Sequence, residues 1–202
     1  MRKIVAALQA PPDDTTWASA PGVHRASLHT PYPDAPAEQP DEVAAIAMVW
    51  TEDSTDAAGA LPVVRDALAA YAVDERVQWD YERDWPDGTS SPGVKRVSFV
   101  RRVPAIDHDE FARHWSEQHA PLARVHHPGI WRYVQNVVVE PLTDRTPELD
   151  GVAELHFRTY ADLQHRMYDS DEGKEIIRAD VRRFLDAPAG WRMLAVERIV
   201  RS

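Results

Sequence analysis

The chain has 202 residues, of which 44% are hydrophobic and 28% charged, and its formal net charge is −10. These values are ordinary for a water-soluble globular protein of one or two small domains, and the negative charge argues against a nucleic-acid partner. No apolar run approaches the roughly 18 residues of a membrane span, the N-terminal segment is not typical of a signal peptide, and cysteine is absent. We therefore expect a cytoplasmic protein without disulfides or thiolate chemistry.

The acidic residues are concentrated in the first half of the chain. Residues 1–93 hold 6 basic and 16 acidic side chains, whereas residues 94–202 hold 17 of each. Residues 86–93 read PDGTSSPG, which is typical of a turn or linker. We therefore predict two units, residues 1–90 and residues 91–202.

The first half reads as strands with one helix. Strands are predicted at residues 3–9, 22–31 and 43–51, the last apolar on both faces, with turn-rich segments between them. Within 22–31, alternation places Val23, Arg25, Ser27 and His29 on one face, opposite His24. Residues 58–73 resemble a helix, and residues 77–85 alternate between aromatic and acidic side chains, as an exposed strand does.

The second half repeats this plan with clearer patterns. Strands are predicted at 94–101, 130–140, 150–158 and 191–200, with a helix from 107 to about 124 and a two-part helix over 160–185. The second helical segment is interrupted near Asp169 and Ser170, where Asp169 and Glu172 are predicted to cap the second part. The order βαββαβ is that of a ferredoxin-like unit.

The first helix of this half carries the candidate site. Asp107 and Glu110 are placed to cap its N-terminus. One face holds a mostly apolar stripe, and Pro121 should loosen the helix beside the one ionisable member and so open a pocket. The members of the stripe are Phe111, Trp115, His119 and Leu122.

Several motifs together resemble one family. They are Phe111, Trp115 and His119-Ala120-Pro121-Leu122, then Arg132-Tyr133-Val134-Gln135-Asn136, then Asp150-Gly151-Val152-Ala153-Glu154. In this order they resemble the EthD family over residues 94–200. The resemblance implies a dimeric α+β barrel and a small-molecule site, because relatives include polyketide cyclases, dehydratases and cofactor-free oxygenases.

The two halves together predict an α+β fold of tandem ferredoxin-like βαββαβ units, with the first unit degenerate. Where the family pairs two subunits sheet against sheet, one chain could supply both sheets here. We therefore expect an internal pseudo-dimer that is either a monomer or a homodimer.

His119 is the main candidate for catalysis, because an imidazole can give or take a proton near neutral pH. The alternative is a histidine that only completes a hydrogen bond in the core. Tyr133 could stabilise an oxyanion, or it could be a core aromatic residue. Asn136 lies three residues further along the strand, so at most one of Tyr133 and Asn136 should face His119, while Trp131 should share the face of Tyr133.

Glu154 and His156 share one face of their strand. If two sheets pack together, this face becomes the barrel interior, where both side chains need partners or a ligand. We predict catalytic roles for His119, Tyr133 and Glu154, and substrate contacts from Phe111, Trp115, Leu122, Trp131, Asn136 and His156.

No metal site is predicted, because the histidine spacings do not converge on one ion and no HExxH motif is present. No dinucleotide, phosphate-loop or GxSxG motif occurs either, so no cofactor is expected. The first hypothesis is a lyase, isomerase or cyclase of secondary metabolism that acts on an aromatic or polyketide-like molecule by acid–base chemistry. The alternatives are a cofactor-free or flavin-assisted monooxygenase on a phenol, and a non-catalytic ligand-binding or stress protein.

Overall fold

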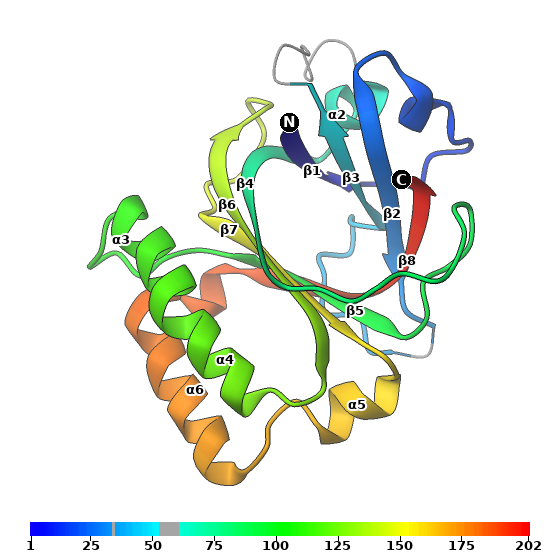
Figure 1. Ribbon diagram of the computed structural model, residues 1–202. Coiled ribbons are helices and arrows are strands. Elements are labelled where there is room, and N and C mark those ends of the chain that lie inside the picture. The colour runs from blue at the N-terminus through cyan, green and yellow to red at the C-terminus, as the bar shows by residue number, and fades with distance from the viewer. Residues whose placement is uncertain (34, 53–60) are drawn as a thin grey trace.

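The computed structural model describes residues 1–33, 35–52 and 61–202, which form eight strands and several helices (Figure 1). The first half contains β1 Arg2–Leu8, the 3₁₀ turn η1 Thr16–Ser19, β2 Val23–Pro31, β3 Ala45–Thr51, α2 Pro62–Arg65 and β4 Ala69–Trp79. The second half contains β5 Val94–Val100, α3 His108–His114, the π-helical turn η2 Trp115–His119, α4 Ala120–His126, β6 Ile130–Pro141, β7 Gly151–Phe157, α5 Tyr160–His165, α6 Asp171–Phe184, the 3₁₀ turn η3 Ala187–Ala189 and β8 Trp191–Arg201.

All strand pairs are antiparallel, and together they close into a barrel in the order β1-β3-β2-β8-β5-β7-β6-β4. Within each half, the fourth strand pairs with the first, the first with the third, and the third with the second. At the two junctions, the second strand of one half pairs with the fourth strand of the other, as β2–β8 and β4–β6. This arrangement confirms the predicted tandem ferredoxin-like fold. The division at residues 90 and 91 stays a prediction.

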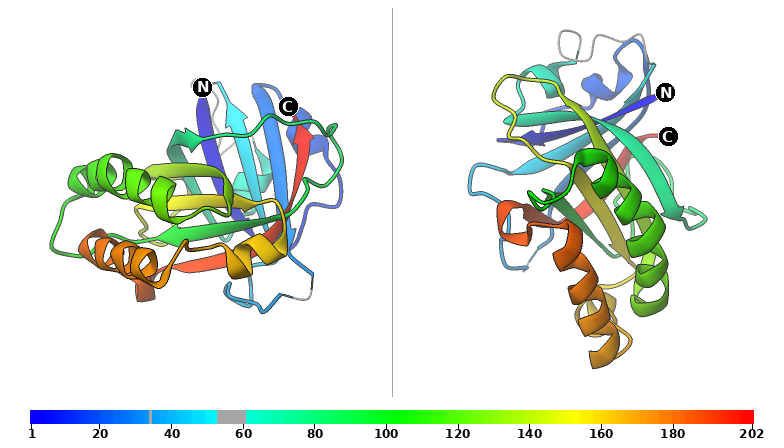
Figure 2. Two further views of the ribbon diagram at one scale, coloured as in Figure 1. Left: turned by 60° about the horizontal axis from the view of Figure 1, so that its bottom comes forward. Right: turned by 90° about the vertical axis from the view of Figure 1, so that its left-hand side faces the viewer.

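The strands separate three apolar cores. One core fills the barrel and includes Ile46, Met48 and Phe99. A second lies outside the first-half sheet beneath η1 and α2, and a third lies outside the second-half sheet beneath the helices, around Phe111 and Phe184. Figures 1 and 2 show the α3–α4 segment and α6 side by side on the same side of the barrel. The second half therefore has a helical layer over its sheet, whereas the described residues of the first half place only η1 and α2 over theirs.

Two predictions in the first half are wrong. Of the helix predicted at residues 58–73, only Pro62–Arg65 is helical, and Ala69 begins β4; residues 58–60 lie outside the described part. The strand predicted at 77–85 ends at Trp79. The alanine-rich segment after residue 66 has a high helix propensity. Its consecutive residues Ala70 and Tyr71 are nevertheless buried on opposite faces of the sheet, and this burial favours a strand.

The predicted faces of β2 are correct for Ser27 and His29 and wrong for Val23. The register shifts between Val23 and Arg25, so an additional residue is accommodated there. Val23 therefore packs in the outer core with Ala26, whereas His29 is buried inside the barrel.

The helix that begins after Asp107 is capped by Asp107 as predicted, whereas the Glu110 carboxylate makes no hydrogen bond to a described residue. The Asp107 carboxylate accepts a hydrogen bond from the Glu110 backbone N–H at 2.7 Å. Residues 115–119 form a π turn, in which the Ala120 N–H donates to the Trp115 carbonyl five residues back. Pro121 lies directly after this turn and cannot donate to the Glu117 carbonyl, so the regular ladder loosens where the sequence predicts it.

The cap of α6 differs from the prediction by one residue. Ser170, rather than Asp169, is the N-cap, and its hydroxyl accepts from the Gly173 N–H at 2.9 Å. Asp169 instead accepts from His126 of α4. The two helices that cover the sheet are therefore tied together at this end.

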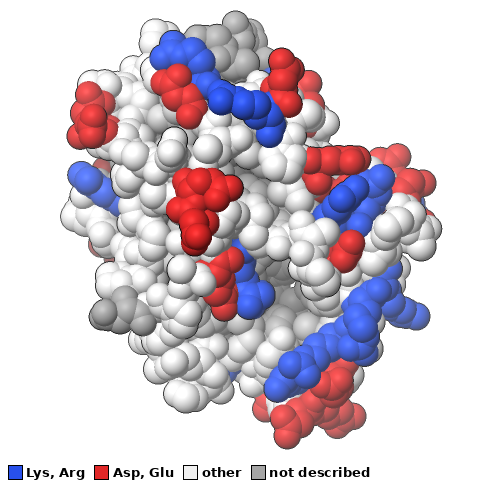
Figure 3. Space-filling view, turned by 180° about the vertical axis from the view of Figure 1, so that it is seen from behind, with Lys and Arg blue, Asp and Glu red and all other residues white. Residues whose placement is uncertain are grey.

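On the face shown in Figure 3, basic and acidic side chains lie next to one another, and a hollow opens near the centre with both kinds of charge at its edge. Within the described ranges, every helix is too short or too polar to cross a membrane.

Candidate functional site

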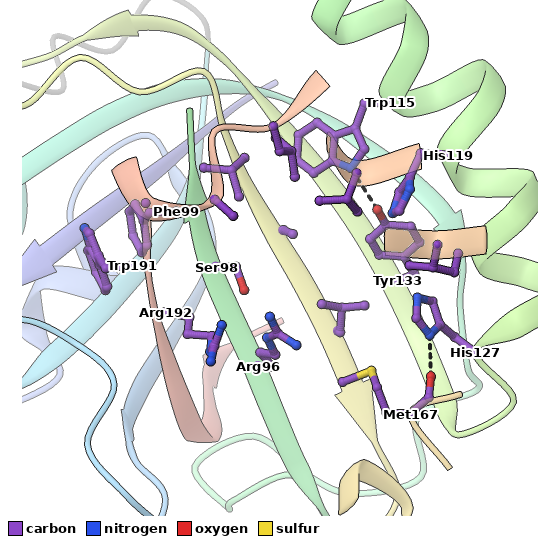
Figure 4. A pocket seen from close by; sticks show the side chains of 18 of the residues that line it. Arg96, Ser98, Phe99, Trp115, His119, His127, Tyr133, Met167, Trp191 and Arg192 are labelled. Carbon is purple, nitrogen blue, oxygen red and sulfur yellow. Dashed lines mark hydrogen bonds between the residues drawn. The ribbon is translucent and has the colours of Figure 1, made fainter. Parts of the chain in front are cut away.

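A cavity of about 390 Å³ lies between the helical layer and the outer face of the second-half sheet. The floor is formed by β5, β7 and the start of β8, and the walls by η2, α6 and the segment between α5 and α6. Figure 4 shows Trp115, His119 and Tyr133 together on one side of this space, and Arg96, Ser98 and Arg192 on the other. The cavity therefore has one aromatic side and one cationic side.

His119 belongs to the cavity wall and is 8% exposed. Its Nδ1 lies 2.9 Å from Oδ2 of Asp180 on α6. The other oxygen of this carboxylate lies 2.8 Å from Nε2 of His114. Since a carboxylate only accepts, the His119 Nδ1 carries the hydrogen, and its Nε2 makes no hydrogen bond to any described residue.

Asp180 is largely buried and yet stays ionised. Burial alone would raise the pKa of its carboxyl, but hydrogen bonds with His119 and His114 outweigh burial and leave the pKa below its ordinary value. A carboxylate in this position fixes the orientation of the His119 ring, as an aspartate beside a general base does.

Tyr133 of β6 is buried in the cavity wall next to Trp115. Its hydroxyl oxygen accepts from Trp115 Nε1 at 2.8 Å and from Gln135 Nε2 at 3.1 Å. The Gln135 amide is oriented unambiguously, because Nε2 also donates to the Trp115 carbonyl, which can only accept. Both bonds therefore use the lone pairs of the phenol, and its own hydrogen has no acceptor among the described residues.

Burial raises the pKa of Tyr133, so the phenol stays protonated at neutral pH. Nearby in the wall, His127 Nδ1 donates to the Met167 carbonyl, and burial lowers its pKa to about 4. The wall thus presents a neutral phenol and a neutral imidazole beside His119.

Arg96 and Ser98 are two residues apart on β5, so both lie on its outer face, where they line the cavity floor. Arg96 Nε and Ser98 Oγ are buried and have no hydrogen-bond partner. Across the β5–β8 pair, Arg192 is held by the carboxylate of Glu38, with Nη2 to Oε1 at 3.1 Å. The floor therefore contains one guanidinium that is bound to a carboxylate and one that forms no ion pair with a described residue.

Two predicted substrate contacts of the helix do not reach the cavity. Phe111 is fully buried in the core beneath α3, where its ring contacts those of Trp115 and Phe184. Leu122 of α4 is half-buried and does not line the cavity. Of the predicted stripe, only Trp115 and His119 form the wall.

The structure places Glu154, Asn136 and His156 on the opposite face of the sheet, inside the barrel. Glu154 accepts from Lys3 Nζ at 2.5 Å and from Lys95 Nζ at 2.9 Å. Burial alone would raise its pKa, but the two lysines and Arg132 hold it well below its ordinary value. Glu154 is thus not brought together with His119 and Tyr133.

The neighbours of Glu154 are held just as firmly. Asn136 Nδ2 donates to Glu154 Oε1 at 2.9 Å and to the Val152 carbonyl at 2.8 Å. His156 Nε2 donates to the Pro92 carbonyl at 2.9 Å, and burial followed by the charge of Lys95 lowers its pKa to about 4. As predicted, Tyr133 and Asn136 face opposite sides of β6.

Trp131 does not share the face of Tyr133, because the register of β6 shifts between Ile130 and Arg132. Its ring stacks on Tyr81 with 4.2 Å between centroids and meets the edge of His156. Trp131 therefore belongs to an aromatic cluster beside the barrel interior, away from the cavity.

Two important residues were not singled out from the sequence. Asp180 lies between Ile177 and Phe184 on the buried side of α6, so a carboxylate within an apolar helical stripe was the available signal. Arg96 follows Lys95 in a strand covered on both faces, and nothing in its local pattern distinguishes it from a surface arginine. Within the described residues, no group of three or more potential ligand side chains gathers to hold a metal ion.

Comparisons with known proteins agree with this architecture. Residues 103–188 match the family model described as EthD domain, which confirms the resemblance seen in the sequence. A structure described as that of an anthrone oxidase-like protein aligns with a TM-score of 0.62 at 10% identity, covering 100% of this chain and 93% of that one. A structure from Fusobacterium nucleatum described as a "Putative monooxygenase" aligns with a TM-score of 0.52 at 9% identity, covering 99% of this chain and 92% of that one.

At these identities the structural likeness concerns the fold, which extends over the whole chain. No curated protein matches the sequence.

Proposed function

Since residues 103–188 match the family model described as EthD domain, we propose that the chain is an enzyme that removes a proton from a small aromatic or polyketide-like molecule in the cavity between helices and sheet. The observation that supports this proposal is the pairing of a base and a hydrogen-bond donor in one wall. His119 has a free Nε2, and Tyr133 has a free hydroxyl hydrogen.

His119 is the proposed base. Asp180 keeps the hydrogen on Nδ1, so the lone pair is on Nε2, and the carboxylate stabilises the imidazolium that forms when Nε2 takes a proton. A positioned general base contributes about 10²- to 10⁴-fold in rate.

Tyr133 is the proposed donor to the oxygen that becomes negative. Removing a proton from a carbon next to a carbonyl moves charge to the oxygen, where a hydrogen bond from a fixed donor is worth most. Trp115 and Gln135 hold the phenol oxygen from two directions, so its hydrogen is aimed before the substrate arrives. We assign Glu154, Asn136 and His156 to the structure of the barrel rather than to the reaction.

An oxygenase is the second candidate, and the descriptions of the two structural neighbours favour it. In this reaction the anion formed by His119 would react with O₂, converting an activated methylene to a carbonyl with release of water. The first step, loss of a proton from carbon, is the same for both candidates.

Anthrone is a suitable probe, because its methylene group lies between two aromatic rings and shares their conjugation with a ketone. Under anaerobic conditions in D₂O, NMR should show that the protein accelerates exchange of the methylene protons beyond the rate in buffer. Oxygen uptake with formation of anthraquinone in air would add the second candidate.

His119→Asn should lower the exchange rate by about a hundredfold or more. His114→Asn is the matched control, because it removes the other partner of Asp180 without touching the cavity, and should retain most of the rate. An unchanged rate in His119→Asn would refute the proposed base. Stabilisation by anthrone without any exchange would identify a non-catalytic binder.

A further inference from the structure

The cationic side of the cavity contains a binding group that the proposed proton transfer does not use. Arg96 makes no hydrogen bond and no ion pair with any described residue, and its Nε is buried. Burial, followed by the charge of Arg192, lowers its pKa, although a guanidinium stays protonated at neutral pH. An unpaired charge in a mostly apolar cavity destabilises the free protein, so a counter-ion from outside would be bound favourably.

The shape of the donor group indicates which anion fits. A guanidinium offers two parallel N–H groups, which match the two oxygens of a carboxylate. Ser98 lies two residues further along the same face of β5, and its buried hydroxyl also has no partner. Arg96 and Ser98 together therefore provide donors for one planar anion.

Arg192 does not compete for this role. Glu38 already neutralises it through both carboxylate oxygens. Two neighbouring guanidinium groups with one carboxylate between them leave a net positive charge on this side of the cavity, at Arg96.

The strand register connects this group to the proposed reaction. Arg96 pairs with Leu155 of β7, and Leu155 pairs with Tyr133 of β6. Arg96 and Tyr133 therefore stand on one line across three strands, with backbones about 10 Å apart, which is twice the usual strand spacing. Leu155 and Ala153 lie between them as an apolar floor, facing Ile177 and Val181 of α6.

We propose that the substrate is an aromatic carboxylic acid, whose carboxylate binds Arg96 and Ser98 while its ring system lies over Leu155 and Ala153 and brings the reacting carbon and oxygen to His119 and Tyr133. The placement of the reacting end of the substrate at His119 and Tyr133 rests on the proposed function. The carboxylate subsite itself rests on Arg96 and Ser98.

The test compares 2-naphthoate with 2-naphthamide, which have nearly the same shape and differ in charge, by calorimetric titration. The wild-type protein should bind the carboxylate at least about tenfold more tightly than the amide, as expected for one charge-assisted bidentate contact. Equal affinities, or no binding of naphthoate at millimolar concentration, would overturn the proposal.

Arg96→Met should abolish the preference for naphthoate, and Arg96→Lys should retain part of it, since lysine keeps the charge without the fork. Arg178→Met is the matched control, because it removes the same charge from the exposed side of α6, where Arg178 pairs with Glu175. The control should bind both probes like the wild type. A preference for naphthoate that survives both substitutions of Arg96 would show that the anion binds elsewhere.

His119→Asn separates this inference from the proposed function. The variant should keep the full preference for naphthoate while losing proton exchange with anthrone. A wild-type protein that prefers naphthoate but exchanges no protons would refute the proposed function and leave the carboxylate subsite standing.

Discussion

The two faces of β5 carry adjacent cations in opposite situations. Lys95 points into the barrel and binds Glu154 at 2.9 Å as well as Glu197. Arg96 points outward into the cavity and forms no ion pair with a described residue, and the Glu38 carboxylate that acts on it from nearby is bound to Arg192. Lys95 is buried and Arg96 is half-buried. The difference separates groups that hold the fold from groups that are available to a ligand.

The barrel interior follows a symmetric plan. Lys3 of β1 binds Glu75 of β4 at 2.8 Å, and Lys95 of β5 binds Glu197 of β8 in the equivalent positions of the second half. Both lysines then meet at Glu154. The unpaired buried atoms of the interior belong to neutral side chains, namely His29, Asn136 and His156. Every charged group of the interior network is thus already neutralised.

The cavity has the opposite character. Its free groups are the His119 Nε2, the Tyr133 hydroxyl hydrogen, the Ser98 hydroxyl and the Arg96 guanidinium. They come from η2, β5 and β6, and none is required to satisfy another. This contrast locates the candidate site outside the barrel.

Substituting the two adjacent cations should have opposite effects on stability. Lys95→Met leaves Glu197 and Glu154 with fewer partners and should lower the free energy of unfolding by about 3–5 kcal/mol. Arg96→Met removes an uncompensated charge and should leave it unchanged or raise it. Urea unfolding of both variants measures the difference. A large loss in Arg96→Met would mean that this guanidinium supports the fold.

Buried histidines should make the protein less stable in mild acid. Burial, followed by the charge of Lys95, lowers the pKa of His29 to about 3, whereas an unfolded histidine titrates near 6.5. As the pH falls below about 6.5, the unfolded state binds a proton that the folded state does not, so stability decreases, by about 3 kcal/mol per such histidine near pH 4. His156, with a pKa of about 4, adds to this decrease.

His29→Gln should flatten the dependence of urea midpoints on pH between about pH 7 and pH 4. The matched control is His24→Gln, because His24 is exposed on the same strand and should leave the slope as it is. Equal slopes in both variants and the wild type would contradict the assignment to His29.

Removing the phenol hydroxyl should affect both stability and rate. Tyr133→Phe leaves Trp115 Nε1 and one hydrogen of Gln135 unsatisfied, which should cost about 1–3 kcal/mol. It should also slow proton exchange, because the proposed oxyanion donor is lost. Tyr71→Phe is the comparison, since the Tyr71 hydroxyl makes one bond, to the Pro147 carbonyl; it should cost less and leave the rate unchanged.

The smallest effect concerns the N-cap of α6, the helix that carries Asp180. Ser170→Ala should cost about 1 kcal/mol, because the Gly173 N–H loses its acceptor. Asp169→Ala keeps this cap and should cost less, since Asp169 and His126 are bonded near the surface. Thermal unfolding of the two variants compares them, and a larger loss in Asp169→Ala would support the cap predicted from the sequence.

Local patterns predicted most of the fold correctly. Asp107 caps its helix, Pro121 follows a loosened turn, and the second-half strands lie where alternation places them. The segment at 69–79 could not be recognised as a strand from its alanines, because burial between two layers decides its conformation. The same limit applies to Trp131, whose side is changed by a register shift that the sequence does not mark.

The candidate site was predicted in part. The spacing of Trp115 and His119 placed both on the cavity wall, and Tyr133 on the strand beneath them. Glu154 lies on the other face, because strand alternation predicts which residues share a face but not which face meets the helices. The positions of Asp180 and Arg96 in the site depend on which distant elements pack together, and only the tertiary structure shows this packing.

The proposed reaction takes place beneath the helices rather than inside the barrel, and two histidines predicted as site residues distinguish these two locations. His119 lines the cavity, and His156 lies in the barrel. The measurement is deuterium exchange of anthrone by NMR with His119→Asn and His156→Asn, each shown to be folded by circular dichroism. We expect a loss of about a hundredfold in His119→Asn and a nearly unchanged rate in His156→Asn; the reverse result would place the reaction inside the barrel.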